Sequence, residues 1–232
     1  MKTIRDLALQ GKKVLIRVDF NVPLDESGRI ADDIRIRMAL PTIRFAIEQQ
    51  AKVILCSHMG RPKGKRVSEF SLGPVAEALA TILGQPVPLA PDCVGPETAA
   101  MVESLKDGEV LLLENLRYHA GEEKNDPDFT RQLGELADVY INDAFAVSHR
   151  AHASVTGVPA RGLEKAAGFL LQKEMEYFHR SMDEPVRPLA AIIGGAKVSS
   201  KLGALENMLA RVDRLLIGGA MANTFLKSQG LD

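Results

Sequence analysis

The side chains best suited to chemistry in this sequence are polar and basic residues that directly follow short apolar runs. Asp19 and Asn21 follow the first run, and His58 and Arg61 follow the second. If the runs are parallel strands, their carboxyl ends lie along one edge of a sheet, where ligands of α/β proteins bind. The full predicted cluster of basic side chains is Arg35, His58, Arg61, Arg117, His149 and Arg150.

A cluster of guanidinium groups favours a bound anion, because like charges repel and each planar fork matches the oxygens of a phosphate or carboxylate. Any one of these arginines could instead be an ordinary surface charge beside an aspartate. Asp19 and Asn21 lie one residue apart, so in an extended segment both could hold a hydroxyl or carboxyl group of a ligand. The alternative is that they open a turn before Pro23.

A second candidate phosphate site lies in the glycine-containing segment 194–201. Its glycines allow close backbone approach, and Lys197 and Lys201 are four positions apart, on one face of a helix. Gly219 follows a later apolar run in the same manner. Tight strand-to-helix turns would explain these glycines equally well. The segment is not a Walker A loop, because G-x-x-x-x-G-K-[ST] is absent. The absence of G-x-G-x-x-G, and of an acidic residue at the right distance after it, disfavours a dinucleotide-dependent oxidoreductase.

Composition excludes several other classes of function. With 29 basic and 30 acidic side chains, the formal net charge is −1, which argues against a protein that coats nucleic acid. No segment approaches the apolar length of a membrane helix, and no signal peptide is evident. The two cysteines suggest reduced thiols and a cytoplasmic location, and the histidine spacing predicts no metal site.

Short β-branched runs alternate with helix-like stretches along most of the chain. We predict strands at 14–19, 52–57, 110–114, 139–142, 189–193 and 214–217, and helices near 38–50, 72–84, 96–106, 128–137, 170–182, 199–211 and 220–229. This alternation predicts an α/β fold with a Rossmann-like parallel sheet sandwiched by helices. Arg35 would then precede the first helix.

The alternation is interrupted once, by a long amphipathic stretch that ends at a proline-rich segment near residue 185. We therefore predict a first domain over 1–168, a connecting helix over 169–185, and the start of a second α/β domain over 186–232. About 45 residues bury little of a sheet, so this second domain is expected to be incomplete.

Several long motifs occur in a fixed order along the chain: RVDFNVP at 17–23, SHMGRP at 57–62, CVGPE at 93–97, LLLENLRYH at 111–119, NDAF at 142–145, HRAHAS at 149–154, GGAKVSSK at 194–201 and LIGGAMANTFL at 216–226. In these motifs the chain resembles the phosphoglycerate kinases. That family exchanges a phosphoryl group between 1,3-bisphosphoglycerate and ADP in glycolysis, giving 3-phosphoglycerate and ATP.

The resemblance implies roles for individual residues. Arg35 and Lys197 are implied as catalytic. The residues implied to bind the phosphoglycerate are Asp19, Asn21, Arg35, His58, Gly60, Arg61, Arg117 and Arg150. Those implied to bind the nucleotide are Gly195, Lys197, Lys201 and Gly219.

The resemblance also implies Mg²⁺ with ATP or ADP as the cofactor, a monomer, and no nucleic-acid or membrane partner. The family's chains are longer, and their glycine-rich segments that contact the magnesium nucleotide do not occur in these 232 residues. We therefore expect the metal ligands to lie outside this chain, and little turnover from it alone. The alternative function is a catalytically deficient module that binds 3-phosphoglycerate.

Overall fold

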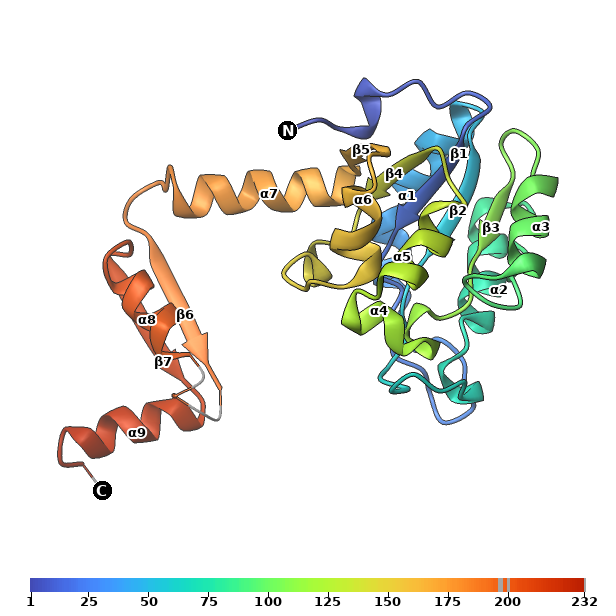
Figure 1. Ribbon diagram of the computed structural model, residues 1–232. Coiled ribbons are helices and arrows are strands. Elements are labelled where there is room, and N and C mark those ends of the chain that lie inside the picture. Colours follow the sequence, from blue (N-terminus) through green and yellow to red (C-terminus); the bar gives the residue numbers. More distant parts are fainter. Residues whose placement is uncertain (196–197, 200, 232) are drawn as a thin grey trace. The chain divides into compact units, whose positions relative to one another are not determined.

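The computed structural model describes residues 1–195, 198–199 and 201–231 (Figure 1). The chain divides into two compact units, Met1–Glu174 and Met175–Asp232. The division falls within helix α7 (Phe169–Met182), which occupies the stretch predicted to connect two domains.

The first unit is built on a five-stranded sheet in which every pair of neighbours is parallel. Its strand order is β3-β2-β1-β4-β5. The strands are β1 (Lys13–Arg17), β2 (Lys52–Cys56), β3 (Val110–Leu112), β4 (Val139–Asn142) and β5 (Glu164–Ala167). The predicted α/β class with a parallel sheet is confirmed.

Helices cover both faces of this sheet, because successive side chains of each strand point in opposite directions. Val14 and Ile16 of β1 belong to the core that includes side chains of α1 and α2, whereas Leu15 belongs to the core that includes side chains of α3 and α5. The strands are therefore apolar along their length, as is usual for a sheet buried on both faces.

The helices of this unit end at residues with clear local causes. Gly84 ends α2 with a φ of 71°, and Asp126 caps α5 by accepting from two backbone N–H groups. The α-helices are α1 (Ile34–Glu48), α2 (Gly73–Leu83), α3 (Pro96–Ser104), α4 (Ala120–Lys124), α5 (Pro127–Gly134) and α6 (Val158–Ala160). Short 3₁₀ turns occupy Ile4–Asp6, Ser68–Phe70, Leu116–Tyr118 and Phe145–Val147, and a π turn spans Ala153–Gly157.

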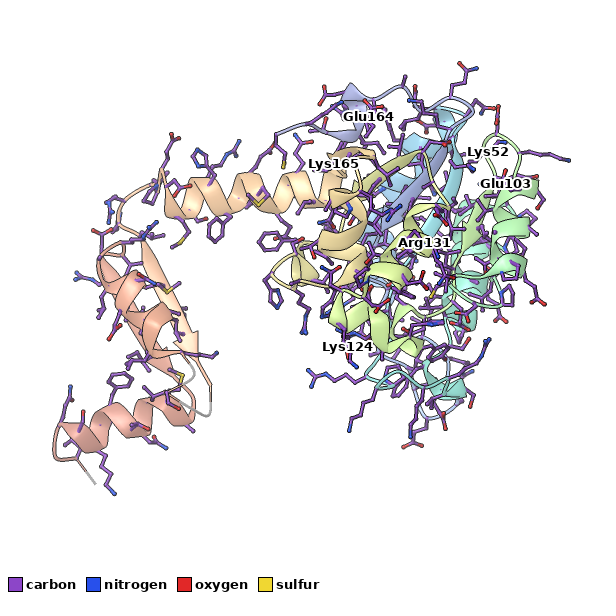
Figure 2. The ribbon with its side chains drawn as sticks, viewed as in Figure 1. Lys52, Glu103, Lys124, Arg131, Glu164 and Lys165 are labelled. Carbon is purple, nitrogen blue, oxygen red and sulfur yellow. The ribbon has the colours of Figure 1, made fainter. Side chains whose placement is uncertain are left out.

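Several details differ from the sequence prediction, which did not contain the short helices α4 and α6. The first helix starts at Ile34 rather than near residue 38, so Arg35 lies in its first turn and not before it. Strand β5 was not predicted, because it has no apolar run. Glu164 and Lys165 of this edge strand are exposed (Figure 2), and Glu164 accepts from Lys2 at 2.9 Å. Charged residues on an edge strand discourage pairing with other chains.

The second unit contains a two-stranded parallel sheet of β6 (Ala190–Gly194) and β7 (Arg214–Gly218), with α8 (Leu202–Leu209) and α9 (Ala220–Ser228). Alternate strand residues are exposed, so the sheet is less buried than that of the first unit. Residues 196, 197, 200 and 232 lie outside the described structure. Within the described residues, none of the helices has both the length and the apolar character needed to cross a bilayer.

Candidate active site

The first unit has a topological switch point beside β1. The chain runs from β1 to β2 and β3 on one side, and then returns to β4 on the other. In open parallel sheets a crevice forms beyond the carboxyl ends of the strands at such a point. Asp19 and Asn21 follow β1 there, and Asp143 follows β4.

Asp19 and Arg35 form an ion pair at this edge of the sheet. The Asp19 side chain is largely buried, whereas that of Arg35 is 45% exposed. The Arg35 side chain is therefore partly exposed to solvent while the ion pair with Asp19 restrains its position. Both residues line the same cavity, together with Met38, Asp143 and further apolar side chains.

Asn21, Gly60 and Arg117 are joined by hydrogen bonds. The N–H of Gly60 donates to Oδ1 of Asn21 at 2.9 Å, and Nη1 of Arg117 donates to the carbonyl of Gly60 at 2.8 Å. Gly60 has a φ of +58°, and a Cβ there would lie 2.4 Å from the Phe70 ring. Only glycine fits this turn, so Gly60 acts by placing the Asn21 and Arg117 side chains. The N–H of Asn21 also donates to Oδ1 of Asp19 at 3.3 Å.

His58 is buried among cations. Its Nδ1 lies 3.1 Å from Nη2 of Arg17, which is itself only 1% exposed. Burial, and then the charges of Arg17, Arg117 and Arg150, lower the pKa of His58 to about 2. The imidazole is therefore neutral, which is how the fold accommodates it beside three guanidinium groups.

Arg117 and Arg150 present donor atoms that the protein does not saturate. Among the residues that the structure describes, Nε of each is buried without a hydrogen-bond acceptor. Nε of Arg117 lies 3.4 Å from Glu123 as an ion pair, without hydrogen-bond geometry. Burial and the neighbouring Arg150 and Arg17 lower the pKa of Arg117, whereas Glu123 raises it. Unsaturated buried donors favour a bound anion.

Two further members of the predicted cluster lie at the surface. Arg61 directly follows Gly60 and is exposed, as is His149. Arg61 follows Gly60 in the chain and His149 precedes Arg150, so both adjoin the cluster in sequence, but no hydrogen bond or ion pair described in the structure joins either side chain to it.

A buried network that the sequence analysis did not single out holds Arg17 in place. Nε of Arg17 donates to Oγ of Ser154 at 2.9 Å, and this hydroxyl donates to Glu122 at 2.6 Å. Glu122 also accepts from the N–H of Ser154 at 2.9 Å and lies 3.8 Å from His152. Glu122 and Glu123 offset two of the three positive charges of Arg17, Arg117 and Arg150, so the cluster keeps a positive surplus.

In the second unit, the predicted glycines meet at the carboxyl ends of β6 and β7. Gly219 has a φ of +65°, and a Cβ there would lie 3.2 Å from the backbone N of Gly195. Nζ of Lys201 donates to the carbonyl of Gly194 at 2.9 Å, and the N–H of Met221 donates to the carbonyl of Gly195 at 2.9 Å. Backbone and one ammonium group thus converge here, beside the start of α9. Lys197 lies outside the described residues.

Comparison with known proteins assigns the family. The family model described as phosphoglycerate kinase matches residues 4–232. The chain belongs to the phosphoglycerate kinase family. It is 65% identical over its whole length to the phosphoglycerate kinase of Desulfotalea psychrophila, and 60% identical over 99% of its length to that of Syntrophobacter fumaroxidans. It spans 59% and 58% of these two proteins, respectively.

Solved structures of the family agree with this assignment. The phosphoglycerate kinase of Pyrococcus horikoshii OT3 matches all of this chain with a TM-score of 0.90 at 36% identity, and the chain covers 58% of it. The enzyme from Coxiella burnetii matches 98% of this chain with a TM-score of 0.86 at 44% identity, with 57% of that chain covered.

The residues missed by sequence reasoning carried only weak signals. Arg17 ends an apolar strand, and an arginine at the last position of a buried strand is unusual enough to suggest a function. Glu122 and Ser154 come from separate turns, and their contact depends on the packing of α4 against the π turn at Ala153–Gly157. No local pattern predicts that contact.

Proposed function

We propose that this chain provides the phosphoglycerate site and part of the nucleotide site of an enzyme that transfers a phosphoryl group between 1,3-bisphosphoglycerate and ADP, giving 3-phosphoglycerate and ATP. The observation that carries the proposal is the cation cluster of Arg17, Arg117 and Arg150 at the carboxyl edge of the sheet. Within the described residues, Nε of Arg117 and Nε of Arg150 are buried there without a hydrogen-bond acceptor. Membership of the phosphoglycerate kinase family supports the same proposed function.

A phosphoglycerate carries a phosphate and a carboxylate, and the site offers complementary groups for both. The guanidinium forks of Arg117 and Arg150 suit the oxygens of a phosphate or carboxylate. Exposed Arg61 extends the basic surface beside Gly60. Asn21 and neutral His58 add polar contacts without further charge repulsion.

Phosphoryl transfer depends mainly on alignment and on neutralising charge at the transferring group. In the direction of ATP formation, the bond from the acyl oxygen of 1,3-bisphosphoglycerate to phosphorus breaks. A terminal oxygen of ADP forms the new bond. In this proposal Arg35 offsets negative charge on the transferring group while Asp19 holds the arginine in position. Lys197 is proposed as a second catalytic residue, and this role rests on the resemblance alone.

The nucleotide phosphates are proposed to meet the backbone at Gly195 and Gly219, with Lys201 nearby. We expect the nucleotide to arrive as its Mg²⁺ complex, in which the metal would neutralise phosphate charge. Among residues 1–195, 198–199 and 201–231, the group of three side chains spaced to bind a metal is in the first unit, away from these glycines in sequence. Among the described residues, no such group lies beside these glycines.

The enzyme is further proposed to be a cytoplasmic monomer without nucleic-acid or membrane partners. The two cysteines, Cys56 and Cys93, are free and buried, which supports a reducing compartment.

The binding part of the proposal is tested by calorimetry with 3-phosphoglycerate. Arg61→Ala removes an exposed cation from the site, and Lys65→Ala removes one from the same loop outside it. We expect Arg61→Ala to weaken binding by about 1–3 kcal/mol, as for a charge-assisted contact, and Lys65→Ala to leave it nearly unchanged. Equal affinities for the two variants would contradict the assignment.

The transfer itself is tested by fusing this chain to the remaining segment of the Desulfotalea psychrophila relative. A coupled assay then compares Arg35→Ala with Arg37→Ala, since both arginines lie in the first two turns of α1 and each pairs with an aspartate. We expect Arg35→Ala to lower kcat by about 10²–10³-fold, as for loss of a transition-state donor, and Arg37→Ala to change it little. Equal activities of the two variants would rule out the role of Arg35.

A further inference from the structure

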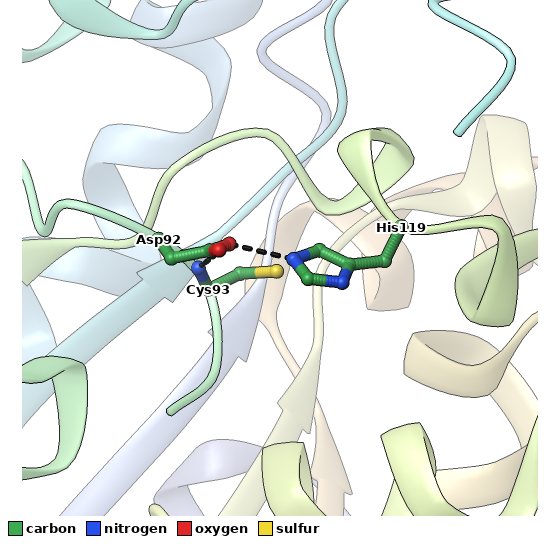
Figure 3. Close-up of side chains that lie close together, drawn as sticks. All are labelled: Asp92, Cys93 and His119. Atoms are coloured by element: carbon green, nitrogen blue, oxygen red, sulfur yellow. Dashed lines mark hydrogen bonds and ion pairs between the residues drawn. The ribbon is translucent and has the colours of Figure 1, made fainter. Parts of the chain in front are cut away.

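Three side chains of the metal-binding types come together outside the proposed phosphoglycerate site. Asp92 and Cys93 lie in the loop before α3, and His119 lies directly before α4 (Figure 3). Their potential ligand atoms all lie within 4.8 Å of one another, and Nε2 of His119 is 2.7 Å from Oδ1 of Asp92. His119 is 27 positions from Asp92 in the sequence, so ligand-spacing patterns do not find the group.

Packing holds each of the three side chains in place. The backbone of Asp92 accepts from Oγ1 of Thr98 at 3.0 Å, and its carboxylate accepts from the N–H of Cys93 at 2.6 Å. The His119 ring lies against the Phe129 ring with centroids 5.2 Å apart. Cys93 is fully buried in the core, so its thiol has little rotational freedom. The cluster is therefore preorganised by two loops that pack together.

A cysteine beside a histidine and an aspartate also suggests a nucleophile, but the environment of Cys93 opposes that interpretation. Its exposure is 0%, and burial, followed by the charge of Asp92, raises the pKa of the thiol well above its ordinary value. A nucleophilic cysteine needs thiolate character and access for its substrate. Binding of a metal ion needs no substrate to reach Cys93, only that the three ligand atoms converge, and they do so here.

We propose that Asp92, Cys93 and His119 bind one borderline-soft divalent cation of the Zn²⁺ class. On binding, the Cys93 proton leaves to solvent as the metal–sulfur bond forms. The Nε2 proton that His119 donates to Asp92 is lost to solvent while Nδ1 takes up a proton, so neutral His119 coordinates through Nε2. The hydrogen bond between His119 and Asp92 is replaced by the two metal bonds. Tetrahedral zinc with ordinary bond lengths places such ligand atoms about 3.3–3.6 Å apart, so small side-chain shifts complete the site. Water supplies a fourth ligand.

The ligand set discriminates between metals. Thiolate and imidazole suit Zn²⁺ or Co²⁺, whereas Mg²⁺ prefers an octahedral set of oxygens. The proposed cation therefore differs from the magnesium of a nucleotide, and the site uses none of the residues proposed to bind phosphoglycerate. The bound ion is expected to cross-link the loop before α3 to the start of α4.

The test titrates the metal-free chain with Zn²⁺ by calorimetry and with Co²⁺ by absorption spectroscopy. Cys93→Ser and His119→Gln each remove a ligand. Cys56→Ser is the matched control for a buried thiol, and His179→Gln is the control for a histidine paired with an aspartate at the surface. We expect one ion per chain, a sulfur-to-cobalt charge-transfer band, and at least about tenfold weaker binding in both ligand variants, with the controls unchanged.

Three results would overturn the proposal: no stoichiometric binding of Zn²⁺, a Co²⁺ spectrum without the thiolate band, or equal losses in Cys93→Ser and Cys56→Ser. Circular dichroism of each variant reports whether it is folded, and the conservative Asp92→Asn variant, which keeps the hydrogen-bonding oxygen, gives a third ligand test. Affinity for 3-phosphoglycerate, measured in parallel, is expected to be unchanged in Cys93→Ser, so this site and the proposed function fail or succeed separately.

Discussion

Nη2 of Arg17 lies 3.1 Å from Nδ1 of His58, and both side chains are buried. A guanidinium group is only a donor, so Nδ1 must accept and the proton of the neutral imidazole lies on Nε2. His58 therefore offers an N–H donor to a bound anion while adding no positive charge to the cluster. This pairing explains how a buried histidine fits beside Arg17, Arg117 and Arg150.

The first prediction follows from this pairing. We expect the His58 imidazole to stay neutral from pH 5 to pH 9, because burial and the neighbouring arginines lower its pKa to about 2. His179 is the internal reference, since its hydrogen bond to Asp183 raises its pKa above the ordinary 6.5. Imidazole NMR signals recorded across this range check both. A His58 midpoint near 6.5 would contradict the buried pairing.

The second prediction concerns stability in acid. Between pH 6.5 and pH 2 the unfolded chain binds a proton at His58 that the folded protein does not, so the free energy of unfolding falls as pH falls. Asp143 acts in the opposite direction, because burial raises its pKa from 3.8 to about 6. Between pH 3.8 and pH 6 the folded protein binds a proton at Asp143 that the unfolded chain does not bind, so this group raises the free energy of unfolding as pH falls. His58 and Asp143 each change the free energy of unfolding by up to about 1.4 kcal/mol per pH unit.

Asp143→Asn should therefore steepen the loss of stability between pH 6 and pH 4. The amide oxygen can still accept from the N–H groups of Leu170 and Leu171, which the Asp143 carboxylate caps at 2.9 and 3.1 Å. Urea unfolding at pH 4, 5, 6 and 7 measures the effect, with the exposed Asp107→Asn as control. Parallel pH profiles for Asp143→Asn and the unsubstituted protein would show that Asp143 does not take up a proton on folding.

The third prediction concerns the glycine turns of the second unit. Gly219→Ala places a Cβ 3.2 Å from the backbone of Gly195 at a φ of +65°. Backbone strain of about 1–3 kcal/mol displaces the turn, and we expect affinity for ATP to fall about tenfold. Gly230→Ala is the control, because its φ is +82° but a Cβ there meets no atom within 4 Å. Fluorescent-nucleotide titration that gives the same affinity for both variants would argue against a nucleotide site at this turn.

The fourth prediction tests the buried network behind the cations. Ser154→Ala removes the acceptor of the Arg17 Nε group and a donor to Glu122. Leaving these buried groups unpaired should lower the free energy of unfolding by about 1–3 kcal/mol. Ser104→Ala, which removes an exposed hydroxyl bonded to Met101, should change it by less than about 0.5 kcal/mol. Urea denaturation measures the free energy of unfolding of both variants. Equal small decreases in Ser154→Ala and Ser104→Ala would mean that the network contributes little to stability.

The sheet of the first unit was largely predictable, because buried parallel strands read as apolar runs. Strand β5 was the exception, since its sequence Glu-Lys-Ala-Ala is that of an edge strand and has no such run. The start of α1 was predicted about four residues late, so Arg35 was placed before the helix and not in its first turn. A short amphipathic signal locates a helix better than it locates its ends.

The candidate site was predictable where its residues follow strands, and unpredictable where they meet through packing. Strand-end reasoning selected His58, Arg117 and Arg150, which the structure brings within electrostatic reach of one another. It did not select Arg17 or Glu122, because their link through Ser154 joins segments more than a hundred residues apart in sequence. The role of Lys197 stays a prediction.

The most direct test of the account is an amide NMR map of this chain titrated separately with 3-phosphoglycerate and with ATP. The account predicts that 3-phosphoglycerate shifts the signals around His58, Arg117 and Arg150, and that ATP shifts those around Gly195, Lys201 and Gly219. If 3-phosphoglycerate perturbs the glycine turns and leaves the signals around His58, Arg117 and Arg150 unchanged, the assignment of the two ligands to these two sites is wrong.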